Sequence, residues 1–406
     1  METRKSLPLI ALVAGLATPL ASHALDFNGY MRSGVGDSSG SDSQSCFQLP
    51  GAPAKYRLGN ECEQYAELGL THDLATFNDG SVLSVEGMVA LYNEYDHSPR
   101  FQGDHGWARL IQSYVKWGNV PALYNGSLWA GRRFYKRNDI HINDFYYWNQ
   151  SATGFGIEDM EINGLKYSYA FSRKDSYFQD EYISRHDFNV GGFDTNPGGE
   201  LEFGISYIDE PSGDDENSGW AVTLQHEQAG FLGGKNTFAV QYGEGPGTGL
   251  GYTGDTSLDN SDKSWRVVEY FDWQVTPRFG GQAQVVYQKD KRADGGDQDW
   301  WSVGARPVYA FSEQFKLVAE VGHDQIDATD GTRKLTKFTI APTWSPAGPG
   351  FWARPEFRLY YTYASWNEAA QRAANLMAEG SALSDTGAFG NARHGSNFGV
   401  QVEHWW

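Results

Sequence analysis

The stretch NFGVQVEHWW (397–406) alternates residue by residue between two kinds of side chain. The first set is polar or small apart from one tryptophan: Asn397, Gly399, Gln401, Glu403 and Trp405. The second set is mostly apolar: Phe398, Val400, Val402, His404 and Trp406. Successive side chains of a β-strand point to opposite sides, so the stretch predicts a strand with one polar and one apolar face.

The same alternation recurs along the chain. It is clear in EFRLYYTY (356–363) and QAQVVY (282–287), and less regular in KLTKFTI (334–340). Only the Ala-rich segment 368–379 suggests a helix, within a loop. Polar, turn-rich stretches separate the predicted strands, and they cover 209–218, 243–263, 290–299 and 324–333. The pattern predicts an all-β protein.

The composition excludes several classes of protein. The 406 residues include 51 Asp+Glu and 32 Lys+Arg, and the net charge of -19 argues against a nucleic-acid-binding protein. Aromatic residues make up 15% of the chain, which argues against disorder. Beyond the first two dozen residues, no apolar run is long enough for a transmembrane helix.

The N-terminal segment METRKSLPLIALVAGLATPLASHA (1–24) predicts a secretory signal peptide. Two basic residues precede a short apolar run, and small residues stand at the positions required for cleavage. The alternative is an uncleaved anchor helix. Cleavage would leave a single domain from 25 to 406. Export would place Cys46 and Cys62 in an oxidising compartment, where a disulfide is the default expectation.

Alternating strands suit both a soluble sandwich and an outer-membrane barrel, which differ in where the apolar face points. Three features favour the membrane barrel. The strands are numerous and carry one aromatic-rich face, and the aromatic residues cluster near strand ends, as membrane-interface girdles do. The predicted final strand also ends on Trp406, an aromatic residue on the lipid-facing side. The sequence therefore predicts a bacterial outer-membrane β-barrel with a polar lumen.

Several aromatic residues share the polar faces with charged side chains. Residues two apart in a strand point to the same side, and several aromatic residues share a side with charged residues in this way. The groups are Tyr30 with Arg32, Tyr65 with Glu63 and Glu67, Trp352 with Arg354 and Glu356, and Trp405 with Glu403. Lys55 and Arg57 also share a face. A sugar ring offers apolar C–H groups to an aromatic face and hydroxyls to ions. A row of such pairs would let a sugar slide through a pore. The alternative for any one aromatic residue is space filling or a place in a girdle.

The segment WAGRRFYKRNDIHINDFYYW (129–148) stops alternating after Arg133. It is too long and charged for a hairpin turn and too aromatic for a disordered loop. Its bases precede Asp139 and Asp144, and opposed charges in an inward loop would narrow and polarise a channel. We expect such a constriction loop at about 133–156. The alternative is an ordinary extracellular loop.

These segments together resemble the maltoporin family of maltodextrin-selective outer-membrane porins. The resemblance rests on DFNGYMRSG (26–34), CFQLPGAPAKYRLGNECEQYAEL (46–68), WAGRRFYKRNDIHINDFYYW (129–148), NPGGELEFG (196–204), WWSVGARPVY (300–309), FWARP (351–355), YYTYASW (360–366) and EHWW (403–406). It implies an 18-stranded antiparallel barrel in a homotrimer in outer-membrane lipid, with an aromatic slide, a polar track of ions and an inward third loop.

The resemblance also implies roles for individual residues. The slide would contain Tyr30, Tyr65, Trp352 and Trp405. The polar track and constriction would contain Arg32, Arg57, Glu67, Arg109, Arg137, Asp139, Asp144 and Tyr146, with Tyr146 narrowing the channel. Cys46 and Cys62 match the family's loop disulfide.

Two slide positions of the family match this chain less well. For an aromatic residue from the second long loop we select Phe101, with Tyr95 as the alternative. For a phenylalanine that precedes the FAVQY stretch (238–242), the matched position is Lys235 and the nearest aromatic residue is Phe231, which we select. Without an aromatic residue there, the slide would have a gap.

We therefore expect passive diffusion of maltose and maltodextrins and no enzymatic activity. A sucrose-type or general porin is the nearest alternative. A hydrolase would need a paired acid and base, for which Asp139 and Asp144 are the only candidates, and a lectin would not account for the number of strands. No spacing indicates a cofactor or a metal, although loop carboxylates are suitable ligands for a structural Ca²⁺.

Overall fold

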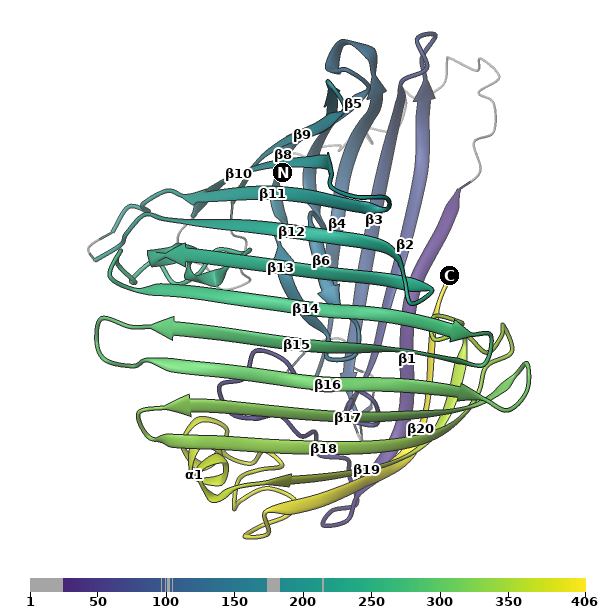
Figure 1. The fold of residues 1–406 in the computed structure, drawn as a ribbon, viewed down its shortest axis with the longest axis vertical. Coiled ribbons are helices and arrows are strands. Elements are labelled where there is room, and N and C mark those ends of the chain that lie inside the picture. The colour runs from purple at the N-terminus through teal and green to yellow at the C-terminus, as the bar shows by residue number, and fades with distance from the viewer. Residues whose placement is uncertain are drawn as a thin grey trace, which may run out of the picture.

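The computed structural model describes residues 25–406 except 96, 99, 101–102, 104, 174–182 and 214. The predicted signal peptide at 1–24 and Phe101 lie outside the described residues. The described strands lie side by side in one sheet that curves round into a barrel, with both ends of the described chain near the same rim (Figure 1).

Eighteen strands of the described residues form one sheet, in which each strand pairs antiparallel with the next. The first nine are β1 (Asp26–Ser38), β2 (Glu63–Thr76), β3 (Val82–Glu94), β4 (Gly106–Val120), β5 (Gly126–Arg133), β8 (Ala152–Ile162), β9 (Leu165–Arg173), β10 (Ser184–Asp194) and β11 (Gly199–Ile208). The others are β12 (Gly219–Phe231), β13 (Gly234–Glu244), β14 (Lys263–Thr276), β15 (Phe279–Lys291), β16 (Gln298–Ala310), β17 (Phe315–Ala328), β18 (Gly331–Trp344), β19 (Glu356–Trp366) and β20 (His394–Trp405).

The barrel closes because β1 also pairs with β20, in a register that runs from Tyr30 opposite Trp405 to Ser38 opposite Asn397. The predicted 18-stranded antiparallel barrel is confirmed. Two 3₁₀ turns (Pro121–Leu123 and Gly245–Gly249) and helix α1 (Glu368–Met377) lie in connections. Among the described residues, no helix combines the length and apolar character needed to cross a bilayer.

The two faces of the wall reverse the pattern of a soluble protein. On β18 the inward residues Lys337 and Thr339 are buried, whereas the outward residues Phe338 and Ile340 are 46% and 36% exposed. An apolar exterior around a polar interior is the arrangement of a transmembrane barrel, because lipid covers the outer face.

The connections differ in length at the two ends of the barrel. At one end, turns such as 163–164, 232–233 and 277–278 have two residues each. At the other end the longest connections cover 39–62, 134–151, 245–262 and 367–393. The predicted turn region 324–333 is mostly strand. Outer-membrane barrels have short periplasmic turns and long extracellular loops, which orients this barrel.

Two long connections fold into the barrel. The first connection (39–62) is held by the confirmed disulfide between Cys46 and Cys62. It contains no strand, so the alternation across 55–59 was wrongly interpreted as one. It docks on the inner wall, where the Leu58 amide donates to Glu320 at 3.1 Å and the Lys337 ammonium donates to the Leu58 carbonyl at 2.6 Å.

The second inward connection is the constriction segment (134–151), which is shorter than the predicted 133–156 because β8 already begins at Ala152. It contains a small hairpin of β6 (Arg137–Ile140) and β7 (Phe145–Asn149). Ile142 donates to Gln282 of β15 at 3.0 Å, and the Tyr147 hydroxyl donates to Gln225 of β12 at 2.6 Å. The Arg57 amide donates to the Ile142 carbonyl at 3.1 Å, which joins the two inward connections.

Candidate functional site

A cavity of about 770 Å³ lies inside the barrel, beside the two inward connections. Its lining combines aromatic rings with ions of both signs: Tyr30, Arg32, Arg57, Tyr65, Glu67, Trp107, Arg137, Asn138, Asp139, His141, Asp144, Tyr146, Lys235, Tyr270, Asp272, Gln282, Trp352 and Trp405. The structure thus brings most of the residues singled out from the sequence into one place.

Five of these rings form what we call the aromatic row. The Trp107 and Tyr65 ring centroids are 6.3 Å apart, and those of Tyr65 and Tyr30 are 6.2 Å apart. Tyr30 faces Trp405 across the β1–β20 pairing, and the Trp405 and Trp352 centroids are 6.2 Å apart. The row therefore runs from β4 across the closure of the barrel to the connection between β18 and β19.

His141 of the constriction segment contacts two rings of this row. Its ring centroid lies 5.0 Å from that of Trp352 and 5.9 Å from that of Trp405. Burial lowers the pKa of His141 well below its usual range, against the opposing effect of Glu403, and the neighbouring arginines lower it further. The neutral imidazole therefore packs against the row without adding a charge to the cavity.

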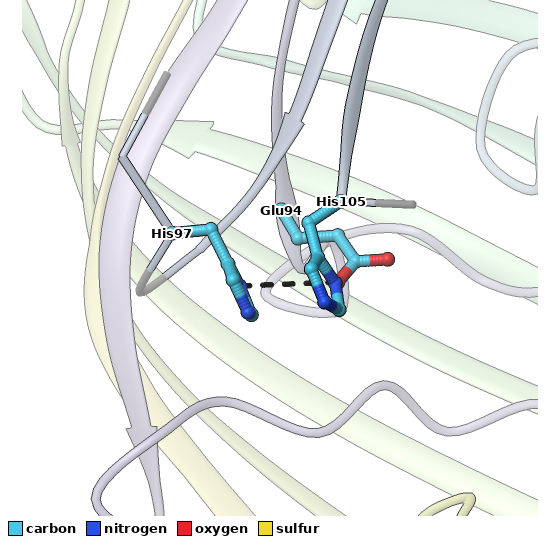
Figure 2. A group of neighbouring side chains, drawn as sticks. All are labelled: Glu94, His97 and His105. Atoms are coloured by element: carbon cyan, nitrogen blue, oxygen red, sulfur yellow. Dashed lines mark hydrogen bonds and ion pairs between the residues drawn. The ribbon is translucent and has the colours of Figure 1, made fainter. Parts of the chain in front are cut away.

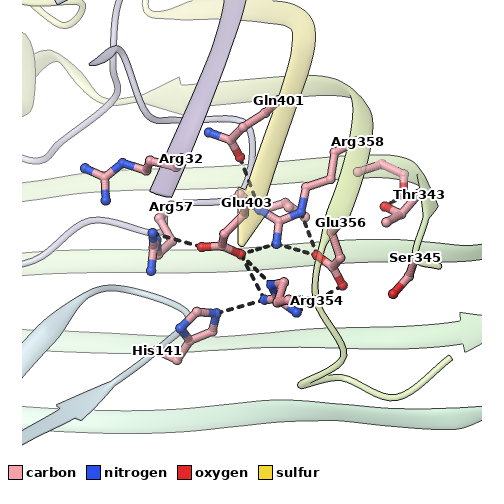
Figure 3. A network of polar contacts seen from close by, with 12 residues as sticks. Arg32, Arg57, His141, Thr343, Ser345, Arg354, Glu356, Arg358, Gln401 and Glu403 are labelled. Atoms are coloured by element: carbon pink, nitrogen blue, oxygen red, sulfur yellow. Dashed lines mark hydrogen bonds and ion pairs between the residues drawn. The ribbon is translucent and has the colours of Figure 1, made fainter. Parts of the chain in front are cut away.

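Behind the row, Glu403 is the centre of a buried polar network (Figure 3). It accepts hydrogen bonds from the Tyr30 hydroxyl and from Arg354 Nε, both at 2.9 Å. It also pairs with Arg57 at 3.2 Å and with Arg358. Arg354 in turn lies 4.2 Å from the centroid of the Trp405 ring. One carboxylate therefore fixes the groups that hold two rings of the row.

A second buried carboxylate extends this network. Glu356 pairs with Lys316 at 2.6 Å. It also pairs with Arg354 at 3.2 Å and contacts Arg358 (Figure 3). Buried charges persist only when they are paired and hydrogen-bonded, so the network must be assembled as a unit.

The constriction segment contributes both bases and acids to the cavity. The Arg137 guanidinium lies 4.1 Å from the centroid of the Tyr146 ring. Burial and the nearby Asp144 raise the pKa of Asp139 to about 6. Burial also acts to raise the pKa of Asp144, but Arg57, Arg32 and Arg137 together lower it. Two neighbouring carboxylates therefore have displaced pKa values in opposite directions.

Further ions flank the row on β1 and β2. The Arg32 guanidinium lies 5.0 Å from the Tyr65 ring centroid and pairs with Glu61 at 3.2 Å. The Tyr65 hydroxyl donates to Glu67 at 2.8 Å. These ions lie beside the rings, where they can exchange hydrogen bonds with a polar solute in the cavity.

Trp352 reaches the cavity differently from the expectation. The alternation across 352–358 predicted a strand residue, but β19 begins only at Glu356, so Trp352 lies in the connection 345–355. Its indole N–H donates to Asp272 of β14 at 3.2 Å, and Gln282 donates to the same carboxylate at 2.7 Å. Trp352 is 45% exposed and presents the most open ring surface of the row.

The structure does not bring Phe231 into the cavity. The pairing of β12 with β13 shifts between Ala229 and Phe231, and such a bulge turns the following side chain to the other face. Phe231 packs instead against the outward Phe271, with the ring centroids 5.4 Å apart. Lys235, the matched position, lies in the cavity and pairs with Glu227 at 2.9 Å. The row has no aromatic residue at this position.

Arg109 lies beside the row but does not line the cavity described above. Its guanidinium is 4.3 Å from the Trp107 ring centroid. Phe101 lies outside the described residues. The alternative Tyr95 is buried, with its hydroxyl close to Gly34 of β1, and it does not line this cavity.

Several residues that line the cavity were not predicted from the sequence, among them Trp107, His141, Tyr270 and Asp272. Trp107 shares the alternation of Arg109, which was a usable signal. Asp272 carries the same signal, because it alternates in phase with Arg266 and Tyr270 on β14. His141 carries no such signal, because its place depends on how the constriction segment docks.

A family model described as LamB porin matches residues 25–406. The barrel is similar to the outer membrane channel DcaP of Acinetobacter baumannii (10% identity, TM-score 0.53, 97% of this chain and 100% of that one). It is also similar to Pseudomonas aeruginosa OpdK with vanillate (10% identity, TM-score 0.51, 95% of this chain and 100% of that one). A third similar structure is the Salmonella typhi OmpF complex with daunomycin (9% identity, TM-score 0.51, 94% of this chain and 97% of that one). At these identities the structures show a shared fold alone.

Proposed function

This chain belongs to the LamB porin family and is an outer-membrane porin, a channel rather than an enzyme, and from this premise we propose that it conducts maltose and maltodextrins by facilitated diffusion. The observation that carries the proposal is the aromatic row with ions on its flanks, inside a cavity that the constriction segment narrows.

The row suits glucose oligomers because each ring offers an apolar face to the C–H side of a sugar. Arg32, Arg57 and Glu67 then exchange hydrogen bonds with the hydroxyls as the sugar moves. Several weak sites in succession allow entry and exit without an energy source. Tyr146 and Arg137 restrict the passage at the constriction segment.

We also propose that the channel works as a homotrimer, embedded in outer-membrane lipid after removal of residues 1–24. This part of the proposal rests on the family resemblance and on the apolar outer wall of the barrel. It needs no cofactor.

The test is single-channel conductance of the purified protein in a planar bilayer, with maltotriose, maltohexaose and sucrose titrated in turn. Saturable block that tightens from maltotriose to maltohexaose, in steps of a third of the open level, is the expected result. Conductance without any block by sugar would mean that the protein is a general porin. The aromatic row would then have only a structural role.

A second candidate is a porin for another oligosaccharide such as sucrose. The specific observation that favours it is Lys235, a cation at the position where the family resemblance calls for an aromatic ring. An interrupted row would bind long linear glucose chains less tightly. Tighter block by sucrose than by maltotriose would select this candidate.

Replacing Tyr146 by alanine should raise single-channel ion conductance, because the phenol and the stacked Arg137 narrow the passage. We expect an increase of roughly one and a half to threefold. The control is Tyr169→Ala, which removes a phenol that is 38% exposed on the barrel. Equal conductance in both variants would place the narrowest point elsewhere.

Ion selectivity should depend on pH near 6, where the buried Asp139 titrates. Above that pH the carboxylate is ionised and favours cations, and below it the group is neutral. Besides Asp144, the charged groups that act on it are Arg137, Arg57 and Lys235. The cation-to-anion permeability ratio should fall by roughly two- to fourfold between pH 8 and 4.5. Asp139→Asn should abolish this pH dependence of the permeability ratio. If the pH dependence persisted in the variant, another titrating group would be its cause.

A further inference from the structure

Three side chains that commonly bind metals gather outside the channel cavity, where β3 ends and β4 begins (Figure 2). Glu94 is the last residue of β3, and His97 and His105 belong to the connection before β4. This connection lies at the end of the barrel with the long loops. Each residue offers one ligand atom, and these atoms lie within 4.8 Å of one another.

The donor atoms converge rather than merely lying close. Nδ1 of His105 lies 2.8 Å from Glu94 Oε2, and Nδ1 of His97 lies 3.9 Å from the same oxygen. The two imidazole rings stack with their centroids 3.8 Å apart (Figure 2). Two ring nitrogens therefore lie within 4 Å of one carboxylate oxygen, and Nδ1 of His97 also lies 3.1 Å from the Tyr95 carbonyl oxygen.

The backbone holds this arrangement in place. The Glu94 amide donates to the His105 carbonyl at 2.9 Å, which closes the base of the connection. The Asn93 side-chain amide donates to the His97 carbonyl at 2.8 Å. The Tyr95 amide donates to the carbonyl of the disulfide-bonded Cys62 at 2.9 Å, so the neighbouring connection supports the cluster.

Two imidazoles and one carboxylate are a ligand set for Zn²⁺ and neighbouring divalent transition ions. Tetrahedral zinc with ligands at about 2.0–2.2 Å requires donor atoms roughly 3.3 Å apart. The side chains of Glu94, His97 and His105 are 39%, 44% and 56% exposed, so an ion can enter and modest side-chain rotation can close the site. Water would fill the fourth position.

We propose that Glu94, His97 and His105 bind a divalent transition-metal ion, with Zn²⁺ as the representative, at the extracellular rim of the barrel. The ion ties the connection between β3 and β4 to the rim. Tyr92 and Trp107 lie next to this site in sequence, and their rings stack with centroids 5.3 Å apart at the outer end of the aromatic row. The metal therefore stabilises the entrance of the channel without entering it.

The test is calorimetric titration of ZnCl₂ into the purified full-length protein, prepared without a polyhistidine tag. We expect one saturable site per chain and at least a tenfold weaker affinity in His97→Gln/His105→Gln. The matched control is His186→Gln/His226→Gln, which removes two histidines that lie outside the cluster. His186 contacts Tyr169 and Asp209, and His226 contacts Thr195. The control should bind Zn²⁺ as the wild type does. Equal affinity in both double variants, or no saturable binding to the wild type, would overturn the proposal.

A second measurement needs only the wild-type chain. Acylation of histidines by diethylpyrocarbonate, mapped by mass spectrometry, should slow at His97 and His105 when Zn²⁺ is added, while His186 reacts at an unchanged rate. Loss of protection on adding a chelator should follow. Uniform reaction rates with and without Zn²⁺ would count against the site even if a variant failed to fold.

Discussion

Replacing Glu403 by alanine should lower the free energy of unfolding by about 3–5 kcal/mol, the cost of removing one partner from a buried ion pair. Glu403 is 1% exposed and balances Arg354, Arg358 and Arg57, which would remain buried with one carboxylate fewer. Urea unfolding of the barrel in lipid vesicles, followed by tryptophan fluorescence, measures the change.

The control for this prediction is Glu368→Ala on α1. Glu368 also pairs with two arginines, Arg372 and Arg393, but its side chain is 67% exposed. Exposed pairs contribute at most about 1 kcal/mol, so this variant should unfold almost as the wild type does. Similar losses in the two variants would mean that burial is not what makes the Glu403 network important. Glu403→Ala should also loosen Tyr30, whose hydroxyl donates to this carboxylate.

Replacing Trp352 by alanine should weaken oligosaccharide binding in the channel by about tenfold, equivalent to about 1.4 kcal/mol. Trp352 offers the most exposed ring of the aromatic row, and a sugar that passes it would lose that stacking surface. Ion conductance should remain nearly unchanged, because in the proposed mechanism the constriction segment, and not Trp352, limits the passage of ions. Block of the ion current by maltohexaose measures the affinity.

The matched control is Trp344→Ala, which removes an indole that is 42% exposed on the outer face and stacks with Phe357. It should leave sugar affinity unchanged. A Trp352→Ala channel that bound maltohexaose as tightly as the wild type would remove the aromatic row from the mechanism. Asp272→Asn offers a milder perturbation, because Asp272 accepts the indole hydrogen bond that orients Trp352.

Where the chain is regular strand, alternation predicted which side chains face the inside of the barrel. Tyr30, Tyr65 and Trp405 lie on uninterrupted stretches of β1, β2 and β20, and the parity that placed them inward agrees with the cavity. The rule has a physical basis, because a strand can present only alternate residues to water. The same rule predicted the barrel and its apolar exterior.

The rule failed where the backbone departs from a strand. Arg57 and Trp352 reach the cavity from connections and not from strands. The alternation rule predicted that they face inward, but it did so by coincidence. Phe231 follows a bulge that reverses its face, and the neighbouring glycines were the only warning in the sequence. His141 depends on the docking of the constriction segment, which is a tertiary contact that no local pattern encodes.

The seam between β1 and β20 has a consequence for biogenesis. Tyr30 and Glu403 are hydrogen-bonded although they lie 373 positions apart in the sequence. The barrel is therefore closed by contacts between the two ends of the described chain. Non-local pairing of this kind is slow, because the entropy of closing the loop is lost before any contact forms. An open, partly assembled sheet would therefore lack the junction of Tyr30 and Trp405. Sugar recognition and closure of the wall would arise in the same late step, so an immature barrel would be unable to bind sugar along the full row.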